Sequence, residues 1–140
     1  MARDPGTEKH FDVDVMCLAV GLSPLTEMLW QAGCQMSFVP ELGGHVPLRD
    51  ENMETTVPGI YVAGDASGVE EASSAMIMGR LAGLAAAHSL AYCADFQERK
   101  MQALKELEEL RSGPAGSKVK RGLSRVQVPG SSDKGGAAAC

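Results

Sequence analysis

The residues with the clearest chemical potential stand at the end of the run TTVPGIYVAGD, residues 55–65. The stretch 59–63 is apolar without polar alternation, which predicts a buried strand. Gly64 would let a ligand come close to the end of that strand, and the carboxylate of Asp65 could accept hydrogen bonds from hydroxyl groups. This arrangement predicts a site for a hydroxyl-rich, anionic cofactor at the carboxyl end of a sheet.

A helix predicted over about residues 72–92 supplies the other half of this site. The first N–H groups of a helix have no intrahelical partner, and its N-terminus favours an anionic group by up to ~2 kcal/mol. We therefore expect the backbone N–H groups of Ser73, Ser74 and Ala75 to face a ligand above the strand. For the Gly-Asp pair alone, the alternative interpretation is an ordinary strand-to-helix turn in which Asp65 caps the helix.

The complete string resembles the second flavin-binding motif of the two-dinucleotide-domain flavoproteins, the family of glutathione reductase and thioredoxin reductase. Three segments are especially similar to the flavin subunits of amine-oxidising complexes such as opine oxidase, hydrogen cyanide synthase and the sarcosine oxidase alpha subunit. They are GLSPLTEML at 21–29, PELGG at 40–44 and RDENMETTVPGIYVAGD at 49–65. The resemblance covers about residues 12–112.

This resemblance implies FAD as the cofactor and an amine or amino acid as the small-molecule substrate, oxidised by hydride transfer to the flavin. It also implies that Asp65, next to Gly64, binds a ribityl hydroxyl, and that the N–H groups of Ser73, Ser74 and Ala75 meet the O2 and N1 edge of the flavin. Glu70 and Glu71 precede the helix, and we expect both to point into solvent. No catalytic residue on the substrate side is assigned.

The phosphate-binding turn that should accompany this motif is missing. A GxGxxG turn needs two glycines two positions apart, and none of the sixteen glycines is so placed. A separate NAD(P)H domain, on the order of 100 residues, is also absent. We therefore expect the C-terminal FAD-contacting portion of a flavin-dependent oxidoreductase, inactive alone, that needs a missing N-terminal half or a partner subunit.

Two other functions stay open. The first is a truncated, non-catalytic fragment or assembly module that binds FAD only with a partner chain. The second is a NAD(P)H-linked reductase with a different substrate, because the missing CxxC pair excludes only the disulfide-reducing members. In each case, strand edges left exposed would favour self-association.

The expected fold class is α/β: an incomplete FAD/NAD(P)-binding Rossmann-like unit with C-terminal helices. Residues 1–11 form a polar lead-in, 12–112 the FAD-binding part and 113–140 a disordered basic tail. The tail carries five basic residues and one acidic residue, so its charge is +4 and that of the remainder is −9. Further elements are expected as strands at 13–20, 36–39 and 45–48, a short helix after Thr26 and a charged helix at 95–111.

Composition narrows the remaining possibilities. An acidic body argues against nucleic-acid binding, which needs a basic face. The sequence contains no run of 18 uncharged apolar residues, so we expect no membrane span. The four cysteines are widely spaced, which predicts neither a metal site nor a dithiol centre and favours a reducing, cytoplasmic setting. They are Cys17, Cys34, Cys93 and Cys140.

Overall fold

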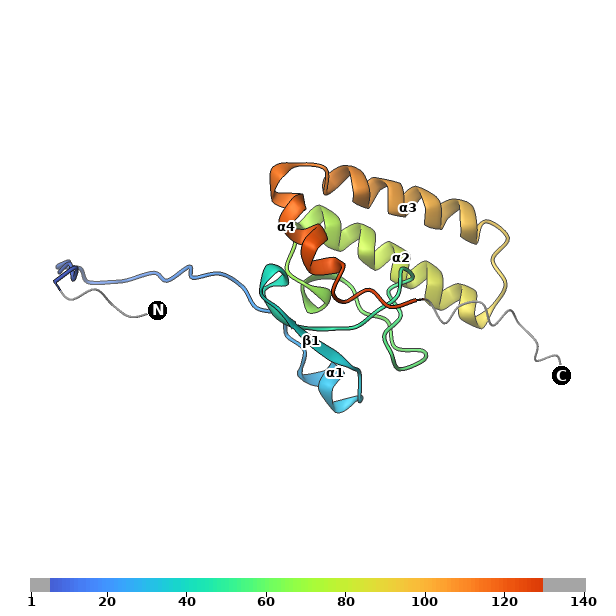
Figure 1. Cartoon of the computed structure of the whole chain (residues 1–140), viewed down its shortest axis with the longest axis horizontal. Coiled ribbons are helices and arrows are strands. Elements are labelled where there is room, and N and C mark those ends of the chain that lie inside the picture. The colour runs from blue at the N-terminus through green and yellow to red at the C-terminus, as the bar shows by residue number, and fades with distance from the viewer. Residues whose placement is uncertain (1–5, 130–140) are drawn as a thin grey trace.

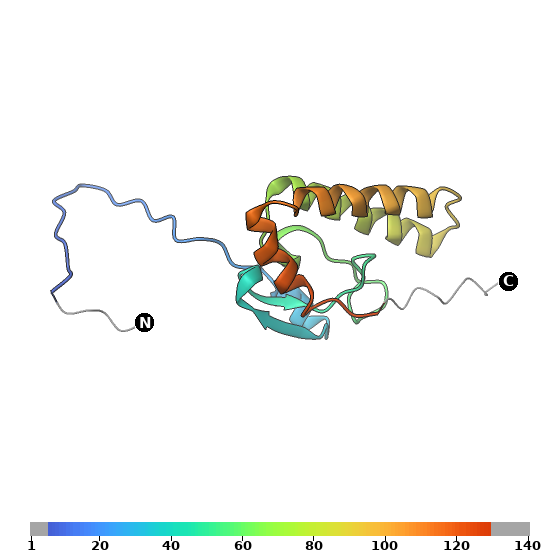
Figure 2. The ribbon, with the colours of Figure 1, turned by 45° about the horizontal axis from the view of Figure 1, so that its top comes forward.

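The computed structural model describes residues 6–129, which form a helical layer over a layer of hairpin and loops (Figures 1 and 2). The upper layer is an antiparallel pair, α2 (Ala72–Leu90) and α3 (Phe96–Leu110). Below it lies a hairpin of β1 (Met36–Val39) and β2 (Gly44–Pro47), paired antiparallel. Within the described residues, this two-stranded pairing is the whole sheet.

Shorter elements connect these layers. α1 (Glu27–Gln31) precedes β1, and the 3₁₀ turn η1 (Pro40–Leu42) joins β1 to β2. A second 3₁₀ turn, η2 (Gly64–Ser67), leads toward α2. The expected short helix, the strand at 36–39 and the helices at 72–92 and 95–111 are confirmed to within about two residues at their ends.

The main core lies between the helical pair and the loop before η2. In α3, Ala103 and Leu107 are one helical turn apart and therefore point the same way, toward α2. Their neighbours in the core share near-complete burial: Met53, Met78, Leu81 and Ala82. This packing fixes the direction of α2, and with it the place where its N-terminus ends.

The expectation of a disordered tail is wrong for the described part of that segment. Residues Pro114–Leu123 form α4, which begins at Pro114 because a proline at the first helical position loses no intrahelical hydrogen bond. α4 packs on η1, and Val126 just after it is fully buried with Val39, Leu42 and Val46. Tertiary burial thus orders a polar sequence. Residues 130–140 of the expected tail lie outside the described residues.

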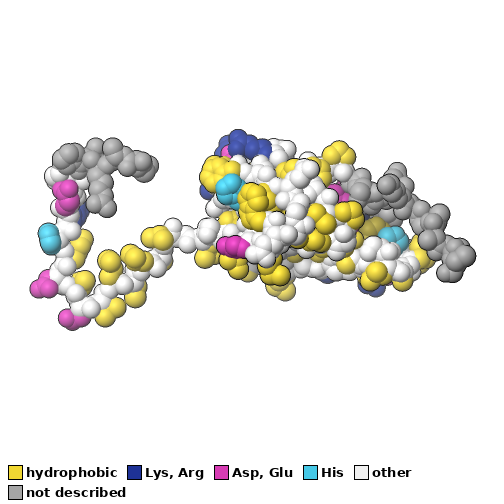
Figure 3. All heavy atoms as spheres, turned by 90° about the horizontal axis from the view of Figure 1, so that it is seen from below, with side chains coloured by type: hydrophobic (Ala, Val, Ile, Leu, Met, Phe, Trp, Pro, Cys, Tyr) yellow, Lys and Arg dark blue, Asp and Glu magenta, His cyan; other side chains and the backbone are white. Residues whose placement is uncertain are grey.

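The expected buried strand at 13–20 is also wrong. This segment is an extended arm that leaves the body of the molecule (Figure 1), and its apolar side chains are 61–89% exposed. They form part of the hydrophobic surface visible along the arm in Figure 3: Val13, Val15, Met16, Leu18 and Val20. A strand needs a neighbour for its N–H and C=O groups, and no other described segment pairs with this one.

The expected strand at 59–63 is replaced by a tight loop. Its pairing is limited to an isolated bridge between Tyr61 and Glu54 and to single backbone bonds, such as Val62 N–H to Met53 O at 2.9 Å. Only Val62 in this stretch is fully buried. The sheet that would bury both faces of the segment is not formed by the described residues, so the apolar run alone does not make a strand.

Candidate functional site

The Gly64–Asp65 pair lies in a turn with a defined geometry. Gly64 has φ +66°, a left-handed conformation that favours glycine, and its carbonyl accepts a hydrogen bond of 2.8 Å from Ser67 Oγ. Gly68 closes the turn at φ +129°, and a Cβ there would stand 3.1 Å from Leu42 Cβ. The turn is therefore held on η1, and it presents Asp65 outward.

The Asp65 carboxylate is free to accept hydrogen bonds. The residue is exposed, and within residues 6–129 its side chain takes part in no hydrogen bond or ion pair. A helix or turn cap would instead bind nearby backbone N–H groups. Asp65 thus keeps its acceptor capacity for a group from outside this turn, such as a hydroxyl.

The N-terminus of α2 follows with its first N–H groups unpaired. Ala75 N–H already donates to Glu71 O at 3.1 Å, so the intrahelical ladder begins with Ala75. The N–H groups of Ser73 and Ser74 precede that bond, and Glu71 at the N-cap makes no side-chain cap. Ser73 is exposed, whereas Ser74 is buried. The donors available to a ligand are therefore those of the first three helical residues.

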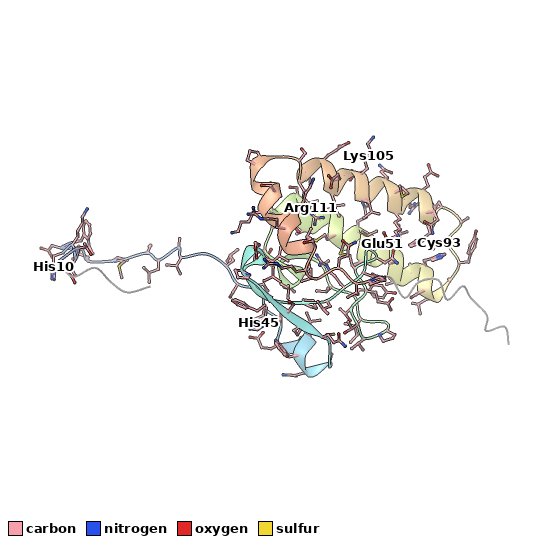
Figure 4. All side chains as sticks on the ribbon, in the orientation of Figure 1. His10, His45, Glu51, Cys93, Lys105 and Arg111 are labelled. Carbon is pink, nitrogen blue, oxygen red and sulfur yellow. The ribbon has the colours of Figure 1, made fainter. Side chains whose placement is uncertain are left out.

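The expectation for Glu70 is wrong, whereas Glu71 is exposed as predicted. The side chain of Glu70 is only 4% exposed, because it forms a bidentate ion pair with Arg111, whose side chain is 13% exposed. Arg111 Nε lies 2.9 Å from Oε2, and Arg111 Nη2 lies 2.8 Å from Oε1. This pair joins the segment before α2 to the end of α3, close to α4 (Figure 4).

Arg49 lies beside this ion pair in the interior. It is 4% exposed, and its Nε has no hydrogen-bond partner in the described part of the chain. Burial, followed by the positive charge of Arg111, lowers the pKa of Arg49 from 12.5 to about 10. The carboxylates of Glu70 and Asp50 act in the opposite direction. The local arrangement is thus a charged cluster under the loop that leads to the site.

Sequence reasoning missed this cluster of Arg49, Glu70 and Arg111. Arg49 was placed in a polar connection, and Arg111 at the end of a charged helix. No spacing in the chain relates these residues, which lie 21 and 41 positions apart. Only the packing of α3 on α2 brings them together.

The residues fit one end of FAD. Gly64 packs so close to the start of α2 that a Cβ added there would stand 3.6 Å from Ala75 Cβ, which keeps the turn and the helix N-terminus adjacent. A free carboxylate beside unpaired N–H groups matches a ribityl chain and an electron-rich ring edge. A cradle for the pyrophosphate is absent, since the sequence has no GxGxxG turn.

Residues 6–129 offer neither a metal centre nor a membrane-spanning helix. No group of three or more His, Cys, Asp or Glu side chains there is arranged to hold a metal ion. Within the same range, no helix combines the length and apolar character needed to cross a membrane.

A glycine–aspartate turn feeding an unpaired helix N-terminus defines the class as a dinucleotide-cofactor oxidoreductase. The chain belongs to the pyridine nucleotide-disulphide oxidoreductase family, whose model matches residues 3–79. This membership implies a flavin or nicotinamide cofactor and a Rossmann-like fold, of which the described residues form an incomplete α/β unit.

The chain is similar to curated proteins whose names identify them as one of the subunits of opine oxidase. It is 38% identical over 79 residues to the protein of Agrobacterium tumefaciens, a stretch that covers 56% of this chain and 16% of the relative. It is 36% identical over 81 residues to that of Rhizobium meliloti, covering 58% of this chain and 15% of the relative. The match thus spans less than a fifth of each relative's length. No solved structure matches the chain significantly.

Proposed function

We propose that this chain is the FAD-contacting C-terminal portion of a flavin-dependent oxidoreductase that oxidises an amine or amino acid. The single observation that carries the proposal is the exposed, unpaired carboxylate of Asp65 beside the unpaired first turn of α2. The family membership and the likeness to opine oxidase subunits support the reaction class.

Each part of the site has a role in this proposal. Asp65 accepts a hydrogen bond from a ribityl hydroxyl, and so fixes the cofactor along the turn. Ser73 and Ser74 donate their backbone N–H groups to the O2 and N1 edge, where the helix dipole favours negative charge. Ala75 shapes this edge through its contact with Gly64. When bound, FAD supplies the hydride acceptor.

A second polypeptide segment completes the site in this proposal, either from a missing N-terminal half or from a partner subunit. Support comes from the arm around residues 13–20, whose apolar side chains are 61–89% exposed. Apolar surface of this kind favours association, and an extended backbone can accept a neighbouring strand. Without that segment, the chain acts as a non-catalytic assembly module that self-associates.

The first test is gel filtration of the purified chain with added FAD, monitored by visible absorption. We expect the chain alone to elute colourless, because no pyrophosphate cradle is present. Tight one-to-one FAD binding by the monomer would contradict the need for a second segment.

The decisive test is a chimera in which residues 12–112 replace the corresponding stretch of the Agrobacterium tumefaciens relative. We expect the chimera to retain FAD and oxidise an opine. Asp65→Asn should weaken FAD binding about tenfold, since a hydrogen bond to a charged group contributes about 1.5 kcal/mol. Glu98→Gln is the matched control, because it also neutralises an exposed carboxylate but lies on α3. A folded chimera without FAD, or equal effects of both substitutions, would refute the assignment.

A further inference from the structure

The buried guanidinium of Arg49 borders a small cavity that is separate from the Gly64–Asp65 turn. The cavity has a volume of about 70 Å³ and lies between the loop at 49–53, α3 and α4. Arg49 is 4% exposed, and its Nε donates to no group in residues 6–129. A buried cation without a hydrogen-bonded partner is costly, so its environment favours an anion that would pair with it.

The neighbouring carboxylates are already engaged elsewhere. Glu70 forms its bidentate pair with Arg111, and Glu51 pairs with Lys100. Asp50 Oδ1 accepts the backbone N–H groups of residues 52 and 54, both at 2.9 Å, and therefore serves the loop itself. None of the ion pairs among the described residues includes Arg49. Its positive charge is thus the one in this cluster without a directly bonded carboxylate.

We propose that this cavity binds a small aliphatic carboxylate, whose two oxygens pair with the Arg49 guanidinium. The planar fork of arginine matches a carboxylate, and such pairs are stronger when they are shielded from water. Arg111 also lines the cavity and adds a second positive charge at the same end. This proposal does not depend on the flavin, because none of its residues belongs to the Gly64–Asp65 turn.

The other walls of the cavity select the kind of anion. They are apolar side chains from three segments: Met53, Leu104, Leu107 and Leu123. Phosphate would leave oxygens facing these side chains without donors, which is unfavourable. A carboxylate with one or two aliphatic carbons places its charge on Arg49 and its alkyl group on the leucines. Because a water needs about 10–15 Å³ of such volume, the cavity holds a group of only a few heavy atoms.

The test is a titration of the full 140-residue chain with sodium acetate at constant ionic strength, with sodium chloride as the balancing salt. Binding is followed through the Arg49 Nε–H resonance in a ¹H–¹⁵N spectrum and through the melting temperature. We expect saturable shifts of the Arg49 resonance and a rise in melting temperature with acetate and propionate. Phosphate and the bulkier trimethylacetate should bind at least tenfold more weakly.

Substitutions then locate the site. Arg49→Gln should weaken acetate binding at least tenfold, whereas Arg99→Gln should leave it unchanged, because Arg99 is an exposed arginine on α3 outside this cavity. If Arg49→Gln fails to fold, the comparison of acetate with trimethylacetate in the unsubstituted chain decides the question. Equal responses to acetate and chloride, or no preference for acetate over trimethylacetate, would overturn the proposal.

Discussion

The ion pair between Glu70 and Arg111 should be a principal determinant of stability, because it holds the segment before α2 against the end of α3. Its carboxylate is only 4% exposed and receives two hydrogen bonds, of 2.8 and 2.9 Å. Replacing one partner of such a buried pair leaves the other charge uncompensated, which costs about 3–5 kcal/mol. We expect Glu70→Gln to lie near 3 kcal/mol, because the released Arg111 is already 13% exposed and can reach water.

A double-mutant cycle measures this interaction directly. Glu70→Gln, Arg111→Met and the double variant are compared with the parent chain by urea unfolding, followed by circular dichroism at equilibrium. We expect the double variant to be more stable than the sum of the single losses predicts, with an interaction energy of about 2–3 kcal/mol. Amide exchange in the first turn of α2 should also become faster in Glu70→Gln.

The matched control is the pair of Lys105 and Glu109 on α3, whose side chains are 77% and 67% exposed and 4.0 Å apart. Its interaction energy should stay below about 0.5 kcal/mol, as is usual for exposed helical pairs. If the Glu70–Arg111 cycle gives a value as small as this control, then the pair does not anchor α2 and the reasoning is refuted.

Two further predictions concern single positions. Gly68→Ala should lower stability by about 1–3 kcal/mol, because φ +129° is strained for alanine and its Cβ would approach Leu42 to 3.1 Å; Gly79→Ala, with open space around it, should not lower the melting temperature. Arg49→Met should raise the free energy of unfolding at pH 7 by up to about 3 kcal/mol, because the buried charge depresses its pKa from 12.5 to about 10. Below pH 10 both states of the parent chain hold this proton and the full penalty applies, whereas between pH 10 and 12.5 only the unfolded state holds it. The advantage of Arg49→Met in urea unfolding should therefore narrow as pH rises through this window, and an unchanged or widening gap would contradict it.

The local elements of this protein follow from short-range patterns in the sequence. α2 and α3 are apolar on one face over many turns, and that periodicity needs no distant partner to be recognised. The β1–β2 hairpin is likewise encoded by two short apolar runs around Gly43 and Gly44. The glycine–aspartate turn before α2 was also predicted, since it depends on neighbouring residues alone.

The elements that depend on distant partners could not be predicted in this way. The apolar run at 13–20 has the composition of a strand, yet it stays exposed because no described segment pairs with it. The polar segment at 114–123 lacks the composition of a core helix, yet it is ordered as α4 by the cluster that includes Leu42 and Val126. Propensity is a weak term, and burial against other segments outweighs it in both directions.

The sequence by itself determined the family of this protein, its flavin-type turn at Gly64–Asp65 and the helix that follows. Only the tertiary structure decided that Asp65 is free and that Glu70 is buried on Arg111. It also decided that Arg49 borders a cavity with its charge unpaired. The physical reason is range. A turn is fixed by the conformational preferences of adjacent residues, whereas a charge is buried, paired or left alone by segments that meet only when the chain has folded.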